Sequence, residues 1–219
     1  MRTLVGHCLL VAGLLGPATV FAQQPAHARL FEPEDLGILE SPDRDEWQQP
    51  DRIMDALGIA DGSRVGDLGA GGGWFTIRLA LRVGPNGRVY AEDIQRPMIE
   101  SIGRRVADQG LTDRVETRLG TEDDPHLPAD LDAVLIVDTY PQFSNPVAVL
   151  RHVHDALAPN GRLGIVDFRK DGAGGPGPPL DERLNPTEVV DVAREAGLAL
   201  IREEQFLRYQ YLLIFGRGH

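Results

Sequence analysis

The sequence predicts an α/β fold: a Rossmann-like, doubly wound and mostly parallel sheet that closes with a C-terminal antiparallel hairpin. Three observations predict it. Short apolar segments alternate with amphipathic helical ones along residues 64–196. One of them, 132–138, contains five consecutive apolar residues, as expected for a central parallel strand buried on both faces. Two extended segments, 198–207 and 209–215, lie almost end to end, and only an antiparallel hairpin fits so short a connection.

The N-terminal residues 1–22 have the pattern of a secretory signal peptide. Arg2 gives a basic start, an apolar stretch runs from Cys8 to Val20, and small residues end the segment at Ala22. Because this stretch is short and interrupted by Gly and Pro, we expect no membrane span in the mature chain. Cleavage would give an exported protein, periplasmic or secreted. An uncleaved segment would instead be an amphiphilic tail on a cytoplasmic protein.

The rest of the chain divides into a short arm and one domain. Residues 23–42 are polar and contain proline, which is typical of a flexible arm. The domain is expected over 43–219, and it opens with a helix marked by apolar residues from Trp47 to Ile59. The expected strands are then 64–68, 88–93, 115–119, 132–138 and 163–168, and the expected helices are 75–83, 98–110, 147–157 and 187–196.

Composition and charge exclude several classes of function. The formal net charge is -11 and Lys170 is the only lysine, so the chain has no basic stripe and nucleic acid is not an expected partner. The single cysteine, Cys8, leaves with the signal peptide, so the mature chain offers no thiolate metal ligand. His152 and His154 are two apart on an expected helix and face different ways, so we expect no metal site. A serine hydrolase would need a Gly-x-Ser-x-Gly elbow, which is absent from the sequence.

The main motif is the glycine-rich segment Asp-Leu-Gly-Ala-Gly-Gly-Gly at 67–73, between the first expected strand and its helix. Glycine lacks a Cβ and tolerates positive φ, so such a turn brings backbone amides close to a ligand. Alone the loop fits two cofactors, and a tight turn without a ligand is a third interpretation. Trp74 argues against a dinucleotide, because the G-x-G-x-x-G fingerprint needs a third small residue at that place to pack helix against strand.

The loop resembles the D/E-x-G-x-G-x-G signature of class I S-adenosylmethionine (SAM)-dependent methyltransferases, through Asp67, Gly69, Gly71 and Gly73. The resemblance implies that SAM is the cofactor and that Gly69 and Gly71 line its methionine and ribose parts. It also implies the seven-stranded fold of that family, whose antiparallel seventh strand matches the terminal hairpin. The resemblance spans roughly residues 47–216.

Four acidic residues are candidates for further cofactor contacts. Asp93 ends the second expected strand and matches the family's strand-end acid, which accepts hydrogen bonds from both ribose hydroxyls. We favour Asp93 over Glu92, which strand alternation turns elsewhere, and a helix cap is the alternative role for Asp93. Glu122 and Asp123 follow the third expected strand, where family members place an acid near the adenine amino group. A solvated acidic turn is the alternative for both.

Asp138 and Tyr140 leave the carboxyl end of the fourth expected strand, where ligands bind in open α/β sheets. The resemblance implies that Asp138 orients or deprotonates the methyl acceptor and that Tyr140 walls the methyl site. A loop cap and simple packing are the alternatives. Many small-molecule relatives carry a histidine pair just after this tyrosine-like position, whereas this chain has Pro141 and Gln142.

The sequence therefore predicts a SAM-dependent methyltransferase that acts on a small-molecule acceptor. Two alternatives stay open: an exported protein that keeps the fold without catalysis, and an NAD-type oxidoreductase. The pattern favours no particular acceptor and no particular oligomeric state. Since SAM is made in the cytoplasm, an exported enzyme would need its cofactor delivered.

Overall fold

The computed structural model describes residue 30 and residues 41–171 and 175–218. The predicted signal peptide, 1–22, lies outside the described residues, as does the predicted arm, 23–42, apart from residues 30, 41 and 42. The strands are β1 (Arg64–Leu68), β2 (Arg88–Asp93), β3 (Val115–Leu119), β4 (Leu131–Val137), β5 (Leu157–Phe168), β6 (Leu198–Glu204) and β7 (Gln210–Arg217). The α-helices are α1 (Arg44–Gln48), α2 (Pro50–Ala56), α3 (Trp74–Arg82), α4 (Arg96–Asp108), α5 (Pro146–Ala156) and α6 (Pro186–Glu195), and two short 3-10 helices are η2 (Tyr140–Gln142) and η3 (Leu180–Glu182).

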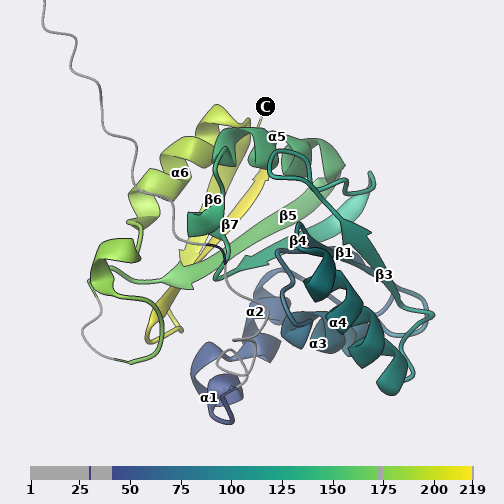
Figure 1. Ribbon diagram of the computed structural model, residues 1–219. Helices are drawn as coiled ribbons and strands as arrows, with labels where there is room; N and C mark the ends of the chain where they lie inside the picture. The colour runs from purple at the N-terminus through teal and green to yellow at the C-terminus, as the bar shows by residue number, and fades with distance from the viewer. Residues whose placement is uncertain (1–29, 31–40, 172–174, 219) are drawn as a thin grey trace, which may run out of the picture.

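These strands form one seven-stranded sheet in the order β3-β2-β1-β4-β5-β7-β6 (Figure 1). β1 to β5 pair in parallel, and β7 is antiparallel to both β5 and β6. The predicted α/β fold with its closing hairpin is confirmed. The chain builds outward from β1 through β2 to β3 and then crosses back to place β4 on the other side of β1. Loops diverge at such a switch point, so a crevice opens at the carboxyl ends of β1 and β4.

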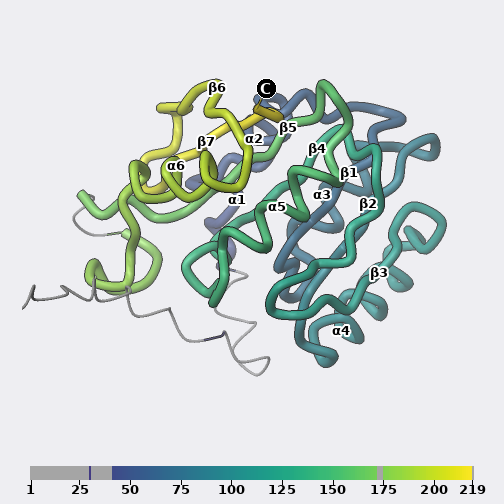
Figure 2. The backbone as a smooth tube through the Cα atoms, turned by 90° about the horizontal axis from the view of Figure 1, so that it is seen from above, coloured from purple at the N-terminus to yellow at the C-terminus, as the bar shows by residue number. Residues whose placement is uncertain are grey.

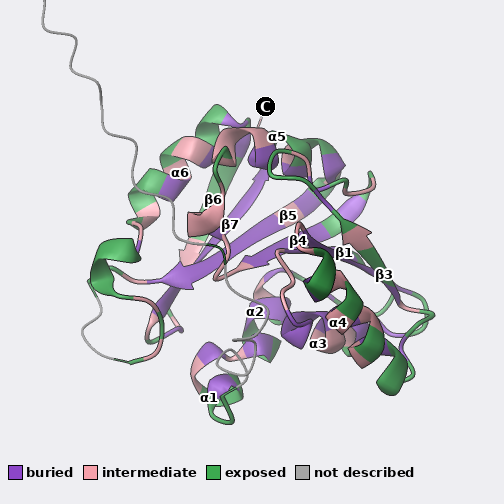
Figure 3. Ribbon diagram, viewed as in Figure 1, coloured by how far each residue is buried: buried purple, intermediate pink, exposed green. Residues whose placement is uncertain are grey.

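Helices cover both faces of the sheet and define two apolar cores. The core on one face contains buried residues of α2, α3 and α4, and the core on the other face contains those of α5 and α6. Viewed from above, α5 and α6 lie over the sheet while α3 lies beneath it (Figure 2). The central strands are buried, and the helices expose only their outer sides (Figure 3). The molecule is thus a three-layer sandwich. The edge of the sheet at which the parallel strands end is left open to ligands.

Two predicted elements differ from the structure for local reasons. The single helix expected over 47–59 is two helices, because Pro50 disfavours helical backbone at the residue before it and Gln49 takes φ 49° instead. The strand expected from residue 163 starts at Leu157, and its register with β4 shifts between Leu131 and Ala133. Neither difference moves the crevice.

Candidate functional site

Two adjoining cavities lie at the carboxyl edge of the sheet. The narrower first cavity surrounds the glycine-rich loop, and the second lies toward α1 and the segment around η3. The second encloses about 980 Å³, within the range of small-molecule sites. Arg44, Asp138 and Gln142 line both, so the two cavities meet at these three side chains.

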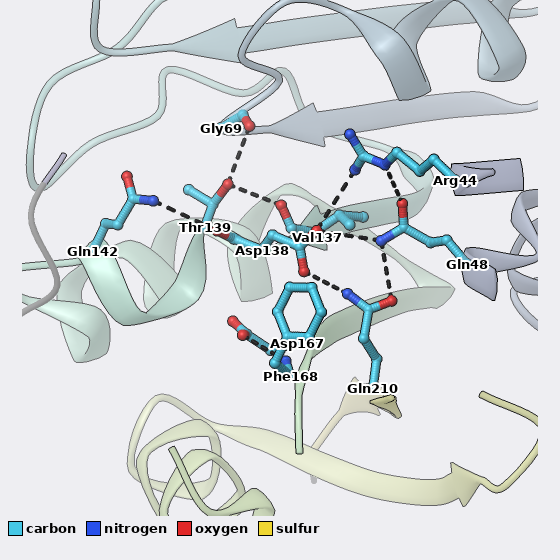
Figure 4. Close-up of polar contacts among 10 residues, drawn as sticks. All are labelled: Arg44, Gln48, Gly69, Val137, Asp138, Thr139, Gln142, Asp167, Phe168 and Gln210. Carbon is cyan, nitrogen blue, oxygen red and sulfur yellow. Dashed lines mark hydrogen bonds and ion pairs between the residues drawn. The ribbon is translucent and has the colours of Figure 1, made fainter. Parts of the chain in front are cut away.

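The glycine-rich loop has the backbone that its glycines allow. Gly69, Gly71 and Gly73 all have positive φ, at 69°, 54° and 81°. A Cβ at Gly69 would lie 2.2 Å from Cγ2 of Thr139, whose hydroxyl donates a hydrogen bond of 3.1 Å to the Gly69 carbonyl (Figure 4). The loop is therefore held against the end of β4 at a distance that only glycine permits. Gly69 and Gly71 line the first cavity, whereas Gly73 lies outside its lining and is the N-cap residue just before α3.

Asp67, predicted as a cofactor residue, lies beneath the loop and also lines the first cavity. Its Oδ2 accepts a hydrogen bond of 2.6 Å from the hydroxyl of Thr76 on α3. Burial is the main cause that raises its pKa to about 6, against the Thr76 hydrogen bond, which lowers it. Asp67 thus ties the strand before the loop to the helix after it.

Asp93 lies at the carboxyl end of β2 and bonds the backbone on both sides of the first cavity, while the N-cap of α4 is Gln95. Its Oδ2 accepts from the Gly71 amide at 3.0 Å and its Oδ1 accepts from the Gln95 amide at 2.9 Å, just before α4. Its carboxyl lines the first cavity and is only 7% exposed. Each carboxylate oxygen has more than one lone pair, so both oxygens retain capacity for a pair of ligand hydroxyls.

Glu92, which the sequence analysis set aside, also lines the first cavity. Alternation does turn it away from Asp93, since Tyr90 belongs to the α5 and α6 core while Ala91 belongs to the other. Both side chains reach the cavity because β2 ends there. Glu92 Oε2 accepts a hydrogen bond of 3.3 Å from the Gly69 amide.

The two predicted adenine acids separate in the structure. Glu122 lines the first cavity and accepts a hydrogen bond of 3.4 Å from the Ser144 hydroxyl. Asp123 is exposed and does not line either cavity. The turn after β3 therefore offers one of these two acids to a ligand in the first cavity.

Asp138 is the centre of a polar network at the junction of the two cavities, where its side chain stays 17% exposed (Figure 4). Gln210 on β7 donates to its Oδ1 at 2.5 Å. Gln48 on α1 donates to its Oδ2 at 3.3 Å, and an Arg44 nitrogen lies 3.6 Å from the same oxygen. Burial raises the pKa of Asp138 to about 6, against the lowering effect of Arg44 and the two glutamine amides. Asp138 fastens the N-terminal segment and the last strand to the end of β4.

Tyr140 is predicted at the wall of the methyl site, but the structure buries it in the α5 and α6 core. Its ring lies 5.6 Å from that of Phe143, and it lines neither cavity. The reason is the 3-10 turn η2, which starts at Tyr140 and directs this side chain beneath the loop. Gln142, at the other end of η2, is the residue of this turn that lines both cavities.

The second cavity contains functional candidates that the sequence analysis missed. Its walls include the aromatic rings of Trp47, Phe168 and Tyr209, with the first two 6.0 Å apart. Asp167 lines it as well, and its Oδ2 is buried with no hydrogen-bond partner among the described residues. Asp167 could have been found from the sequence as the one acid within the strand Leu157–Phe168. A buried carboxyl without a partner costs free energy and is rarely kept without a role.

Comparisons with known proteins agree with this geometry. Residues 67–163 match the family model described as a methyltransferase domain. The nocamycin O-methyltransferase of Saccharothrix syringae is 33% identical over 63% of this chain and 48% of its own length. The ubiquinone/menaquinone biosynthesis C-methyltransferase UbiE of Ectopseudomonas mendocina is 30% identical over 71% of this chain and 59% of its own. The chain thus spans about half the length of the curated relatives it matches.

Solved structures extend the match over nearly the whole domain. A SAM-dependent methyltransferase from Aquifex aeolicus superimposes with a TM-score of 0.79 and 28% identity, covering 85% of this chain and 98% of that one. The O-methyltransferase NcsB1, solved with S-adenosyl-L-homocysteine (SAH), shares the fold with a TM-score of 0.62 at 21% identity.

The fold and the cavity around the glycine-rich loop define a ligand-binding α/β domain of the doubly wound class. Within that class, the matched family model and the structural match over 85% of this chain show that it is similar to class I SAM-dependent methyltransferases. The resemblance seen in Asp67, Gly69 and Gly71 is confirmed at the level of the family.

Proposed function

We propose that this protein is a methyltransferase that binds SAM in the first cavity and a small-molecule acceptor in the second. The observation that carries the proposal is the junction of the two cavities at Arg44, Asp138 and Gln142. Methyl transfer needs two ligands held end to end with water excluded, and positioning alone supplies much of the rate. Two cavities that meet at one set of side chains provide that arrangement.

The residues of the first cavity fit the cofactor. Four acidic side chains besides Glu92 line it, and Arg44 is the one cation among the described residues of its lining. An acidic site favours a ligand that carries a positive sulfonium. Asp93 has free acceptor capacity for ribose hydroxyls, and the apolar side chains of Ile94 and Phe143 offer surfaces for a flat base. Bound SAM supplies the methyl group on its sulfonium sulfur.

Titration calorimetry of the purified domain with SAH and with NADH tests this function. We expect SAH to bind and NADH not to bind, because Trp74 occupies the place where a dinucleotide site needs a small residue. Absence of SAH binding at millimolar concentration by the folded protein would refute the proposal. An Asp123→Ala variant is a matched control, since this acid lies outside both cavities.

A second experiment separates an enzyme from a binding protein that has lost catalysis. The protein is incubated with SAM and a pooled extract of small molecules, and SAH release is measured. Asp167→Ala serves as the comparison, because this residue lines the second cavity and not the first. We expect SAH release by the unmodified protein and weaker release by the variant. Binding of SAH without any turnover in the extract would favour the non-catalytic alternative.

Export of the mature chain is a further part of the proposal. It is supported by the signal-peptide pattern of residues 1–22, which lie outside the described residues. No helix among the described residues is long and apolar enough to cross a membrane. Mass spectrometry of the N-terminus in exported and cytoplasmic fractions tests it. We expect the exported form to begin after Ala22, and a full-length chain confined to the cytoplasm would refute export.

A further inference from the structure

Glu92 has one carboxyl oxygen that nothing in the described structure satisfies. The side chain is 2% exposed and lines the first cavity. Its Oε2 accepts the Gly69 amide, while its Oε1 is buried and has no hydrogen-bond partner among the described residues. A buried polar atom without a partner costs free energy, so its persistence at a ligand cavity points to a partner supplied by the ligand.

That oxygen lies against the turn after β3, at the border of the first cavity. Oε1 packs against Gly120, where an added Cβ would lie 1.9 Å from it, so only a glycine in the turn after β3 leaves room for the Glu92 carboxyl in this position. Thr121 and Pro125 of this turn line the same cavity. Oε1 therefore lies between the glycine-rich loop and the turn after β3, two segments that both border the cofactor cavity.

The charges around Glu92 favour its uncharged form. Asp67 on β1, Asp93 on β2 and Asp124 after β3 are the acidic groups that face it. Arg118 is in register with Glu92 on β3, and its two terminal nitrogens bond the His126 carbonyl and Glu116, while its buried Nε has no hydrogen-bond partner among the described residues. Burial, followed by the negative charge of Asp93, raises the pKa of Glu92 to about 8, although the Gly69 amide lowers it.

We propose that Glu92 is a second cofactor-binding acid, one that stays protonated and donates a hydrogen bond from Oε1 to an acceptor atom of the adenosine part of the ligand. This role is complementary to that of Asp93, whose oxygens already accept two backbone amides and remain acceptors. One strand end then offers a donor and an acceptor to the same nucleoside. The inference rests on the proposed function, since it assumes that the first cavity binds SAM.

The probe for this inference is 5′-methylthioadenosine, a nucleoside thioether without the amino and carboxyl groups of SAM. It does not titrate between pH 6.5 and 9.5, so any pH dependence of its affinity in that range belongs to the protein. We expect its dissociation constant, measured by calorimetry, to be flat below about pH 8 and to rise above it, by more than tenfold at pH 9.5. The sign follows because the protein must hold the proton that it donates.

Two substitutions at Glu92 separate the proton from the side chain. Glu92→Gln keeps a neutral donor that does not titrate, so we expect affinity within about threefold of the unmodified protein at pH 6.5 and no loss at pH 9.5. Glu92→Ala removes the donor, and we expect binding roughly tenfold weaker at every pH. Asp93→Asn is the control: it removes the charge that disfavours ionised Glu92, so the pH dependence should begin at a lower pH.

Three results would overturn the inference. They are a flat affinity of the unmodified protein up to pH 9.5, a pH dependence that persists in Glu92→Gln, and unchanged binding by a folded Glu92→Ala protein. Failure of the proposed function looks different, because the folded unmodified protein would then bind neither methylthioadenosine nor SAH at any pH. Circular dichroism of each variant shows whether the fold is kept.

Discussion

Replacing Gly69 by alanine should destabilise the domain more than the same change at Gly71, although the two glycines share one loop. Both have positive φ, and an alanine there costs about 1–2 kcal/mol from backbone strain. At Gly69 the new Cβ also meets Thr139, with its nearest atom at 2.2 Å, whereas at Gly71 it meets no heavy atom within 4 Å. Thr139 is held by hydrogen bonds to the Gly69 and Val137 carbonyls, so it does not move aside freely.

Overpacking of this kind costs about 1–3 kcal/mol, so Gly69→Ala should lose about 2–5 kcal/mol in total. Gly71→Ala should lose about 1–2 kcal/mol. Equilibrium unfolding in urea measures both, provided that the denaturant slope is unchanged. Adding Thr139→Ser to Gly69→Ala removes the closest methyl and should restore about 1 kcal/mol in a double-mutant cycle. Equal losses in the two glycine variants, with no coupling to Thr139, would refute the close contact.

Three further predictions concern the buried acids. Asp93→Ala should weaken SAH binding by about 1–3 kcal/mol, the usual loss for a buried hydrogen-bonded charge, and calorimetry with an unchanged dissociation constant would contradict it. Asp138→Ala removes the acceptor of the Gln48 and Gln210 amides and should lower unfolding free energy by about 1–3 kcal/mol; urea unfolding that matches the unmodified protein would argue against the network. In the unfolded chain Asp67 loses its proton near its ordinary pKa of 3.8, whereas in the folded protein burial raises that pKa to about 6. The free energy of unfolding therefore falls as pH rises from about 3.8 to about 6. Relative to Asp67→Asn, which does not titrate, the unmodified protein should lose about 2 kcal/mol from pH 4 to 6, and a difference that is constant with pH would contradict the buried-acid assignment.

Local patterns predicted the fold because the elements that define it are local. The five apolar residues 133–137 mark β4 as a strand buried on both faces, and the short link between the last two strands requires an antiparallel pair. The glycine-rich loop could also be predicted from the sequence, since positive φ at Gly69 and Gly71 is a property of the loop itself. The break between α1 and α2 was in principle readable too, from the proline at residue 50.

Side-chain direction at the ends of strands was harder to predict. Alternation assigns Glu92 to the face opposite Asp93, and that assignment is correct inside the sheet. At the last residues of β2 the sheet no longer separates its two faces, so both acids reach the same cavity. Tyr140 shows the converse, because a 3-10 turn sends a residue near the crevice into the core.

The contacts of Asp138 could not be predicted from local sequence patterns, because its partners come from the two ends of the domain. Gln48 lies 90 positions before it and Gln210 lies 72 positions after it, and the two glutamine side chains also bond each other at 3.1 Å. The terminal hairpin, which the sequence analysis used to choose between cofactor classes, therefore has a second consequence. It carries Gln210 on β7 to the point where both cavities meet, so the last strand and the first helix are joined through one carboxyl at the junction of the proposed cofactor and acceptor sites.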